Sequence, residues 1–340
     1  MAMQGGLALL GLVAAYATWQ RPKETQKAER TLVLSASKQS LEKLHFDDGT
    51  RFVEVAKVAG SEPRLWVALG FLEGKRPVFD AGVAQVDADA GVSRMAAVPP
   101  PEPPPNRRVL ASERADTLFA RFMPFEATRA LGTQPKEKLD ELGLVGSERH
   151  LEVTVAGQAH RFLVSKPSHG MIGSYVQDEK SQEVYLVQSS IFSELDPASQ
   201  LLVDRRLHLF KQPEFDHFSV AFEGKTVEYV QENANVPSAA KVAKASQPEK
   251  PDELAKNWHD KVWNRLVVTE VLGQGELPKA GEPKVVLKLV YLAQGKEKGW
   301  LELGRDPSKA VWARTENTAS WVGVHQGAEE TIQEAKHLVE

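Results

Sequence analysis

An alternating pattern of apolar and polar residues between positions 150 and 210 is the feature that most constrains the fold of this chain. In the segment HLEVTV, the side chains Leu151, Val153 and Val155 alternate with polar ones, which is typical of an antiparallel strand with one buried face. The segments HRFLVSK, GSYVQDE and EVYLV continue the pattern as further strands, and SIFSEL follows as a short helix. The stretch therefore predicts two antiparallel hairpins followed by a helix.

A degraded copy of this arrangement lies near the C-terminus. The separation between matched residues runs from 137 positions, for Tyr175 and Trp312, to 141 positions, for Thr128 and Thr269. Such a nearly constant offset indicates an internal duplication. The other matched pairs are Leu131 with Leu272, Gly132 with Gly273, Gly157 with Gly295, Phe162 with Trp300, Val187 with Val324, and Leu195 with Ile332.

We therefore expect an α+β protein, in which an N-terminal transmembrane helix is followed by tandem helix-plus-antiparallel-hairpin repeats. A length of 340 residues suits two or three domains. The expected segments are a membrane anchor or signal segment (1–20), a strand-rich region ending in a proline-rich loop (31–110), a first repeat (111–232), an Ala/Lys/Pro-rich linker (233–252) and a second repeat (253–340).

Helical spacing supports one amphipathic helix at the start of each repeat. In the first, Ser112 is a suitable N-cap, and Ala115, Leu118, Phe119 and Phe122 share one face. In the second, four apolar residues recur at every fourth position, which predicts one buried helix face. They are Leu254, Trp258, Val262 and Leu266.

The first 19 residues carry no charged side chain, and as a helix they would span about 28 Å, close to the thickness of a bilayer core. A cleaved signal peptide, with the small residues Ala15 and Ala17 at the cleavage site, and a buried core helix are the alternatives. The basic residues that follow would keep that flank in the cytoplasm by the positive-inside rule. We nevertheless expect a single-pass inner-membrane protein whose body is periplasmic.

Charge and cysteine content exclude several classes of site. The formal net charge is −4, so the chain lacks the basic field that nucleic-acid binding needs, and we expect no nucleic-acid partner. Cysteine is absent, which rules out disulfides, thiolate catalysis and cysteine-based metal sites.

Histidine provides the best metal candidate. His150 and His160 lie on facing strands of one predicted hairpin, with Glu152 close by. Strand alternation places His150 opposite the Leu151 face, however, whereas His160 shares a face with Phe162. The two imidazoles should then point apart, so we interpret both as structural residues and expect no metal site.

Three other clusters resemble chemical sites without completing one. His259 and Asp260 are neighbours on a predicted helix and point about 100° apart. Ser168 stands beside His169 but has no acidic partner in the sequence pattern. The run Asp204-Arg205-Arg206 fits either a bidentate anion site or a salt-bridged strand start. Because the phosphate, dinucleotide and nucleophile-elbow motifs are absent as well, we predict no catalytic residues, no cofactor and no enzymatic activity.

The segments FLVSK, GSYV, EVYLV, SIFSEL and VDRRLHLF resemble a bacterial domain-of-unknown-function family. Its members have one N-terminal membrane helix and a duplicated, mostly extracytoplasmic α+β body, and they are encoded beside gliding-motility-type ABC transporters and their auxiliary subunit. The chain differs from that pattern in its proline run, its long linker and the lack of basic residues before the first helix. The family carries no catalytic residues to transfer.

The resemblance implies a non-enzymatic, membrane-anchored periplasmic accessory or scaffold protein of an ABC-type transport or gliding-motility-like system. Its expected partners are the membrane and transporter or auxiliary subunits, with the oligomeric state left open. One alternative is a soluble, signal-cleaved periplasmic binding protein. Another is a hydrolase built around the hairpin of His150 and His160.

Overall fold

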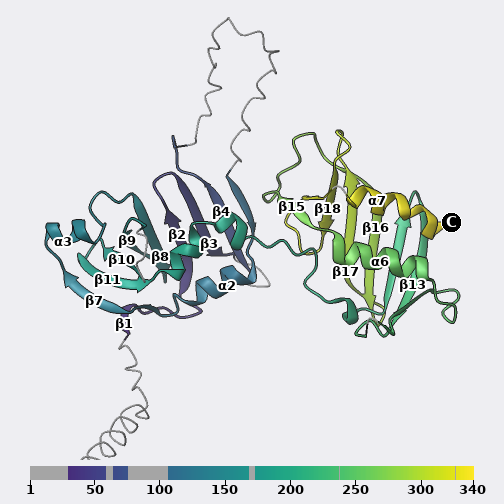
Figure 1. Ribbon diagram of the computed structural model, residues 1–340, viewed down its shortest axis with the longest axis horizontal. Coiled ribbons are helices and arrows are strands. Elements are labelled where there is room, and N and C mark those ends of the chain that lie inside the picture. Colours follow the sequence, from purple (N-terminus) through teal and green to yellow (C-terminus); the bar gives the residue numbers. More distant parts are fainter. Residues whose placement is uncertain (1–29, 59–63, 76–105, 168–172, 237, 326) are drawn as a thin grey trace, which may run out of the picture.

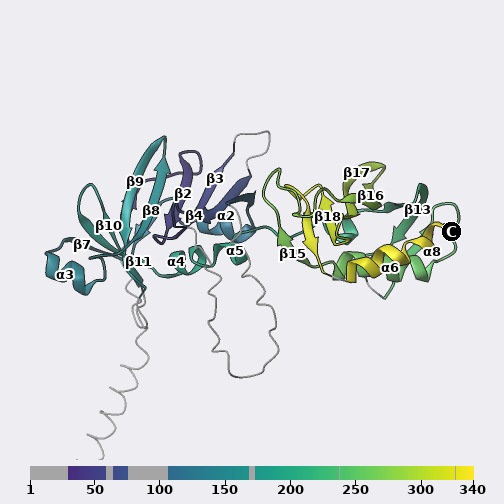
Figure 2. The ribbon, with the colours of Figure 1, turned by 90° about the horizontal axis from the view of Figure 1, so that it is seen from above.

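The computed structural model describes residues 30–58, 64–75, 106–167, 173–236, 238–325 and 327–340. These residues form two lobes, one at each end of the molecule in Figure 1, and each lobe is built on one antiparallel sheet. In the second lobe the helices lie along one side of the sheet, as the rotated view in Figure 2 shows. In the first, the short helix Lys136–Glu141 packs near Leu163 and Val184, on the face of the sheet opposite the main core. Each lobe encloses its own cluster of buried apolar side chains.

The sheet of the first lobe has nine strands in the order β5-β4-β3-β2-β8-β9-β10-β11-β7. Their bounds are β2 (Leu41–Asp47), β3 (Arg51–Lys57), β4 (Leu65–Phe71), β5 (Arg107–Leu110), β7 (Arg129–Thr133), β8 (Arg149–Val155), β9 (Gln158–Val164), β10 (Gly173–Asp178) and β11 (Glu183–Gln188). A separate pair joins β1 (Thr31–Leu34) to β6 (Phe125–Ala127). The helices are α2 (Glu113–Ala120), α3 (Lys136–Glu141), α4 (Ser190–Leu195) and α5 (Ala198–Leu201).

The sheet of the second lobe has eight strands in the order β14-β13-β12-β16-β17-β18-β19-β15. Their bounds are β12 (His217–Phe222), β13 (Lys225–Glu232), β14 (Lys241–Lys244), β15 (Val268–Val271), β16 (Lys284–Ala293), β17 (Lys296–Arg305), β18 (Val311–Thr315) and β19 (Val322–Val324). The short 3-10 helix η1 (Gln212–Glu214) precedes β12, and the α-helices are α6 (Glu253–Arg265), α7 (Gly327–Glu334) and α8 (Lys336–Val339).

The two sheets share one internal strand order. In the first it is β8-β9-β10-β11-β7 and in the second β16-β17-β18-β19-β15, with β2 and β12 as the next strands along. The turns of the matching hairpins carry Gly157 at φ 77° and Gly295 at φ 76°, a left-handed conformation that favours glycine.

The predicted α+β fold class is wrong, because strands make up 43% and helices only 19% of the described residues. Regions outside the expected hairpins are also paired strands, since pairing satisfies backbone groups that would otherwise be buried without partners. Strands β2 to β5 extend the first sheet beyond β8. The described protein is mostly β.

Sheet pairing also places two segments differently from the expected domain plan. Strands β12 and β13 lie within residues 111–232, the expected first repeat, yet β12 pairs with β16 of the second lobe. Residues 233–252, expected as a linker, contain β14, which pairs with β13 and buries Val242 and Ala243. An edge strand needs few apolar residues, so its composition resembles that of a linker. The proline run at 98–106 lies outside the described residues, apart from Asn106.

The predicted single-pass inner-membrane localisation is contradicted. The longest α-helix in the described part of the chain, α6, has 13 residues and spans about 20 Å, against a hydrocarbon core of roughly 30 Å. None of the described helices combines the length and the hydropathy that a membrane crossing needs. Residues 1–20, which the prediction assigned to the membrane, lie outside the described residues.

Helix α2 matches its prediction, since the Ser112 hydroxyl accepts from the Ala115 amide at 3.4 Å and Leu118 and Phe119 are buried. In α6, Trp258 and Val262 are buried as expected, but Leu254 is 56% exposed. Ala255 and His259 complete the buried face instead. The face is therefore rotated by about one residue from the predicted one.

Candidate functional site: a cavity between the lobes

The two lobes meet at the end of the first sheet formed by β4 and β5. Arg107 of β5 donates to the carboxylates of Glu270 and Glu276, each at 3.0 Å, and to the Val271 carbonyl at 3.1 Å. The Gln274 amide donates to the Arg108 carbonyl at 2.8 Å, so backbone as well as side-chain bonds join the lobes here.

A second contact lies on the segment that connects the lobes. Arg64, just before β4, donates to the side-chain oxygen of Asn317 at 2.6 Å. The Asn317 amide nitrogen donates in turn to the Arg206 carbonyl at 2.8 Å. These bonds hold one end of the second sheet against the connecting segment.

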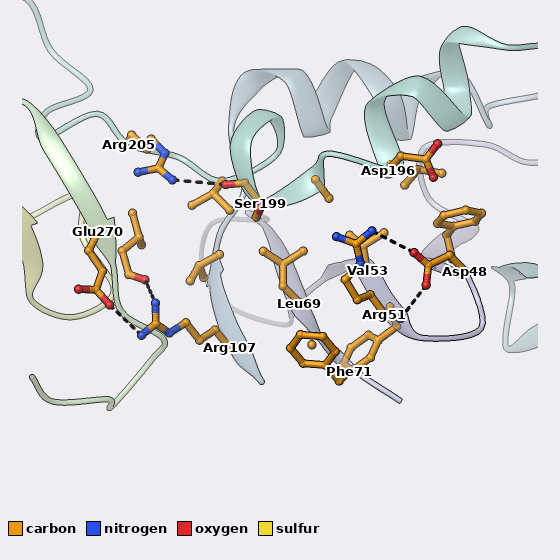
Figure 3. Close-up of a pocket in the computed structure, with 18 of the residues that line it drawn as sticks. Asp48, Arg51, Val53, Leu69, Phe71, Arg107, Asp196, Ser199, Arg205 and Glu270 are labelled. Carbon is orange, nitrogen blue, oxygen red and sulfur yellow. Dashed lines mark hydrogen bonds and ion pairs between the residues drawn. The ribbon is translucent and has the colours of Figure 1, made fainter. Parts of the chain in front are cut away.

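A cavity of about 360 Å³ lies beside the first of these contacts, that of Arg107 with Glu270 (Figure 3). Its wall comes from β2, β3, β4 and β5 of the first sheet, from α4 and α5, and from β15 of the second lobe. Most of the lining is apolar, and the wall contains Phe46, Phe52, Val53, Leu69, Phe71, Val109, Leu195, Ala198, Val203 and Val271.

A buried arginine supports one side of the cavity. Arg149 of β8 holds both carboxylate oxygens of Asp196, at 2.9 and 3.1 Å, and donates to the Ser165 carbonyl at 3.0 Å. Its guanidinium lies 5.2 Å from the ring centre of Phe46 and 5.6 Å from that of Phe192. Asp196 itself lines the cavity, and this geometry fixes the end of α4 at the wall.

The β2–β3 turn supplies the polar rim at the far end. Asp48 accepts from the Thr50 and Arg51 amides at 2.9 and 2.7 Å and from the Arg51 guanidinium at 3.2 Å. Burial alone would raise the pKa of Asp48, but these bonds to Arg51 and Thr50 hold the pKa below its ordinary value. This carboxylate is therefore charged at neutral pH.

The predicted histidine candidates do not form a metal site. In the β8–β9 register, His150 pairs with Leu163 and His160 pairs with Val153, so the two imidazoles belong to opposite faces of the sheet. His150 instead lies 3.6 Å from Asp47. No group of three or more potential metal ligands occurs within the part of the chain that the structure describes.

His259 lies in the core of the second lobe, far from any cavity wall described above. It is fully buried and stacked on Phe218, with ring centres 4.4 Å apart. Burial lowers its pKa to about 4, so the imidazole is neutral at pH 7. The side-chain nitrogen of Gln212 contacts both residues: it donates to the Asp260 carboxylate at 3.2 Å and lies 3.5 Å from Nδ1 of His259. The candidate at Ser168 and His169 lies outside the described residues.

The structure separates the two interpretations of Asp204-Arg205-Arg206. Arg206 takes both oxygens of Asp204, with bonds of 3.0 and 2.9 Å, as a local salt bridge. Arg205 points into the rim of the cavity and lies near Ser199 (Figure 3). Sequence reasoning named this arginine but missed the apolar wall beside it, because that wall comes from five separate segments.

Comparison with family models, with curated proteins and with solved structures found no match to this chain.

Proposed function

We propose that the protein is a non-enzymatic binding protein that holds a small, largely apolar molecule in the cavity between its lobes. The observation that carries this proposal is the cavity itself, whose apolar wall is contributed by both lobes. Its volume of about 360 Å³ falls in the range of small-molecule sites, roughly 300–1,000 Å³.

The apolar wall explains why such a molecule would bind. Transfer of apolar surface out of water is favourable by about 25 cal/mol per Å². Val53, Val109 and Leu195 form a firm part of the wall, since each is buried in the first core while also lining the cavity. A wall held this firmly is formed before the ligand arrives, which reduces the entropic cost of binding.

The polar groups of the cavity support binding rather than catalysis. Each carboxylate that lines it is held by an arginine: Asp48 by Arg51, Asp196 by Arg149 and Glu270 by Arg107. The described lining also contains no histidine that could activate Ser199 or Thr269 as a nucleophile.

The accessory role beside an ABC-type transporter, which the family resemblance implies, stays a prediction. The first alternative to it was a soluble, signal-cleaved periplasmic binding protein, and the cavity supports only the binding part of that alternative.

A neutral fluorescent probe tests the proposal. We expect N-phenyl-1-naphthylamine to bind the full chain with one site and increased emission. Leu69→Trp, which fills part of the cavity, should weaken binding at least tenfold, whereas Leu254→Trp on the exposed face of α6 should leave it unchanged. Absence of probe binding, or equal binding by both variants, would contradict the proposal.

A further inference from the structure

Arg205 differs from the other charged residues of the cavity. It lies in the segment that connects the lobes, and its guanidinium makes two long hydrogen bonds of 3.4 Å, both to backbone carbonyls. One carbonyl belongs to Ser199 in α5 of the first lobe and the other to Thr269 in β15 of the second. The guanidinium therefore lies where the two lobes and the cavity meet (Figure 3).

The surrounding carboxylates are already engaged by other arginines. Arg51, Arg107 and Arg149 hold the carboxylates of the cavity wall, and Arg206 holds Asp204. Within the described residues, Arg205 has no ion pair with any carboxylate. A guanidinium stays protonated at any physiological pH and binds a carboxylate through two parallel N–H donors. Arg205 is exposed at the rim of the cavity, where its guanidinium is hydrated and accessible to an anionic group on a ligand.

The wall next to Arg205 is apolar. Val203 precedes it by two residues, Ala198 adjoins one of its carbonyl partners, and Val271 lies two residues beyond the other. The apolar wall continues from there to Val109 and Leu69. A ligand with its anionic group on Arg205 would therefore place the rest of its length against side chains that exclude water.

We propose that the cavity takes an aliphatic carboxylate, with its carboxylate on Arg205 and its hydrocarbon chain along the wall. This inference rests on the proposed binding function and specifies the ligand class for the same site. The carboxylate would replace the two long backbone bonds of Arg205 with charge-assisted ones. Each additional methylene that still fits should strengthen binding about fourfold, because burying one CH₂ contributes about 0.8 kcal/mol.

Displacement of N-phenyl-1-naphthylamine from the full chain gives a direct comparison of ligands. The probes are octanoate and decanoate as carboxylates, decanol as the neutral analogue and decyltrimethylammonium as the cation, all below their aggregation limits. We expect decanoate to bind about tenfold more tightly than decanol or the cation, and more tightly than octanoate.

Substitutions assign that preference to one residue. Arg205→Gln should remove the tenfold preference while leaving decanol binding unchanged, and Arg205→Lys should keep part of it. Arg129→Gln, an exposed arginine of β7 remote from the cavity, is the matched control and should bind like the unmodified chain.

The outcomes separate this inference from the proposed function. Equal binding of decanoate and decanol, unaffected by Arg205→Gln, would overturn the ligand class and leave an apolar binding site. Tighter binding of the cation would overturn it in favour of a site built on Glu270. If neither N-phenyl-1-naphthylamine nor any of the aliphatic ligands binds, both the ligand class and the proposed binding function are overturned.

Discussion

The two lobes share a strand order but cover their sheets differently. In the first lobe, the sheet end formed by β3 to β5 is covered by three short helices, α2, α4 and α5, of eight, six and four residues, and a cavity remains beside α4 and α5. In the second, the 13-residue α6 lies across the sheet, and large aromatic side chains fill the space beneath it. The two lobes therefore differ in the helices and in the size of the side chains that cover similar sheets.

The closed core of the second lobe is an aromatic cluster. The rings of Trp263, Phe215 and Tyr291 lie with their centres 4.8 to 5.5 Å apart, and His208 stacks on Trp263 at 5.1 Å. Each aromatic side chain buries a large surface, and a smaller cavity of about 260 Å³ remains beside His208, Trp263 and Tyr291. The first lobe instead places smaller side chains such as Val53 and Val109 at its cavity wall.

The largest effect should come from opening the closed core. Trp258 is fully buried, and its indole N–H donates to the Thr331 carbonyl at 2.9 Å. Trp258→Ala should lower the free energy of unfolding of the second lobe by about 3–5 kcal/mol, because it leaves a cavity in the core and removes the indole hydrogen bond to the Thr331 carbonyl. Urea denaturation measures this loss in the free energy of unfolding. Leu254→Ala, on the exposed face of the same helix, should change stability by less than about 0.5 kcal/mol.

The same measurement sharpens the comparison between lobes. Leu195 already borders the cavity, so Leu195→Ala enlarges an existing space. It should lower the free energy of unfolding by only about 2 kcal/mol, the low end of the range for a buried leucine. A loss as large as that of Trp258→Ala would contradict the view that the first lobe is the less completely filled of the two.

A smaller effect should follow from removing the charge that the first lobe buries. Arg149→Met leaves Asp196 without its partner, but the Asp196 side chain is 46% exposed and can be hydrated. We expect a loss of about 2 kcal/mol in unfolding free energy, below the 3–5 kcal/mol typical of a fully buried pair. Arg129→Met, the exposed control, should leave the unfolding midpoint unchanged. Loss of probe binding in Arg149→Met would further show that the pair positions the cavity wall.

The last effect is confined to acidic pH and concerns the neutral histidine of the second lobe. Burial lowers the pKa of His259 to about 4, while the unfolded chain has an ordinary value near 6.5. Between these values the unfolded state binds the proton that the folded state excludes, so stability falls as pH drops from 6.5 towards 4. His259→Phe should flatten this part of the stability profile, measured by urea midpoints across that range. His337→Phe, on an exposed residue of α8, should leave the slope unaltered.

Local patterns predicted the parts of the fold that depend on neighbours in sequence. The β8–β9 hairpin and the Ser112 cap of α2 both appear where the pattern placed them. Strand β14 was missed because an edge strand can be polar. The exposed Leu254 was misplaced because one residue of rotation on a helix changes which face is buried.

The cavity could not be predicted in this way, because its wall depends on distant contacts. Arg107 and its partner Glu270 are 163 residues apart. The sequence left Arg205 and Arg206 as equivalent candidates for an anion site. Only the three-dimensional position of Asp204, which Arg206 engages, distinguishes them and leaves Arg205 at the cavity.

Hydrogen exchange of the full chain with and without decanoate tests the central claim most directly, since it reports where the ligand acts in both lobes at once. The account predicts slower exchange in peptides covering 48–53 and 195–205 of the first lobe and connecting segment, and in 268–271 of the second. Unchanged exchange in these three segments, or protection confined to one lobe, would contradict a binding site between the lobes.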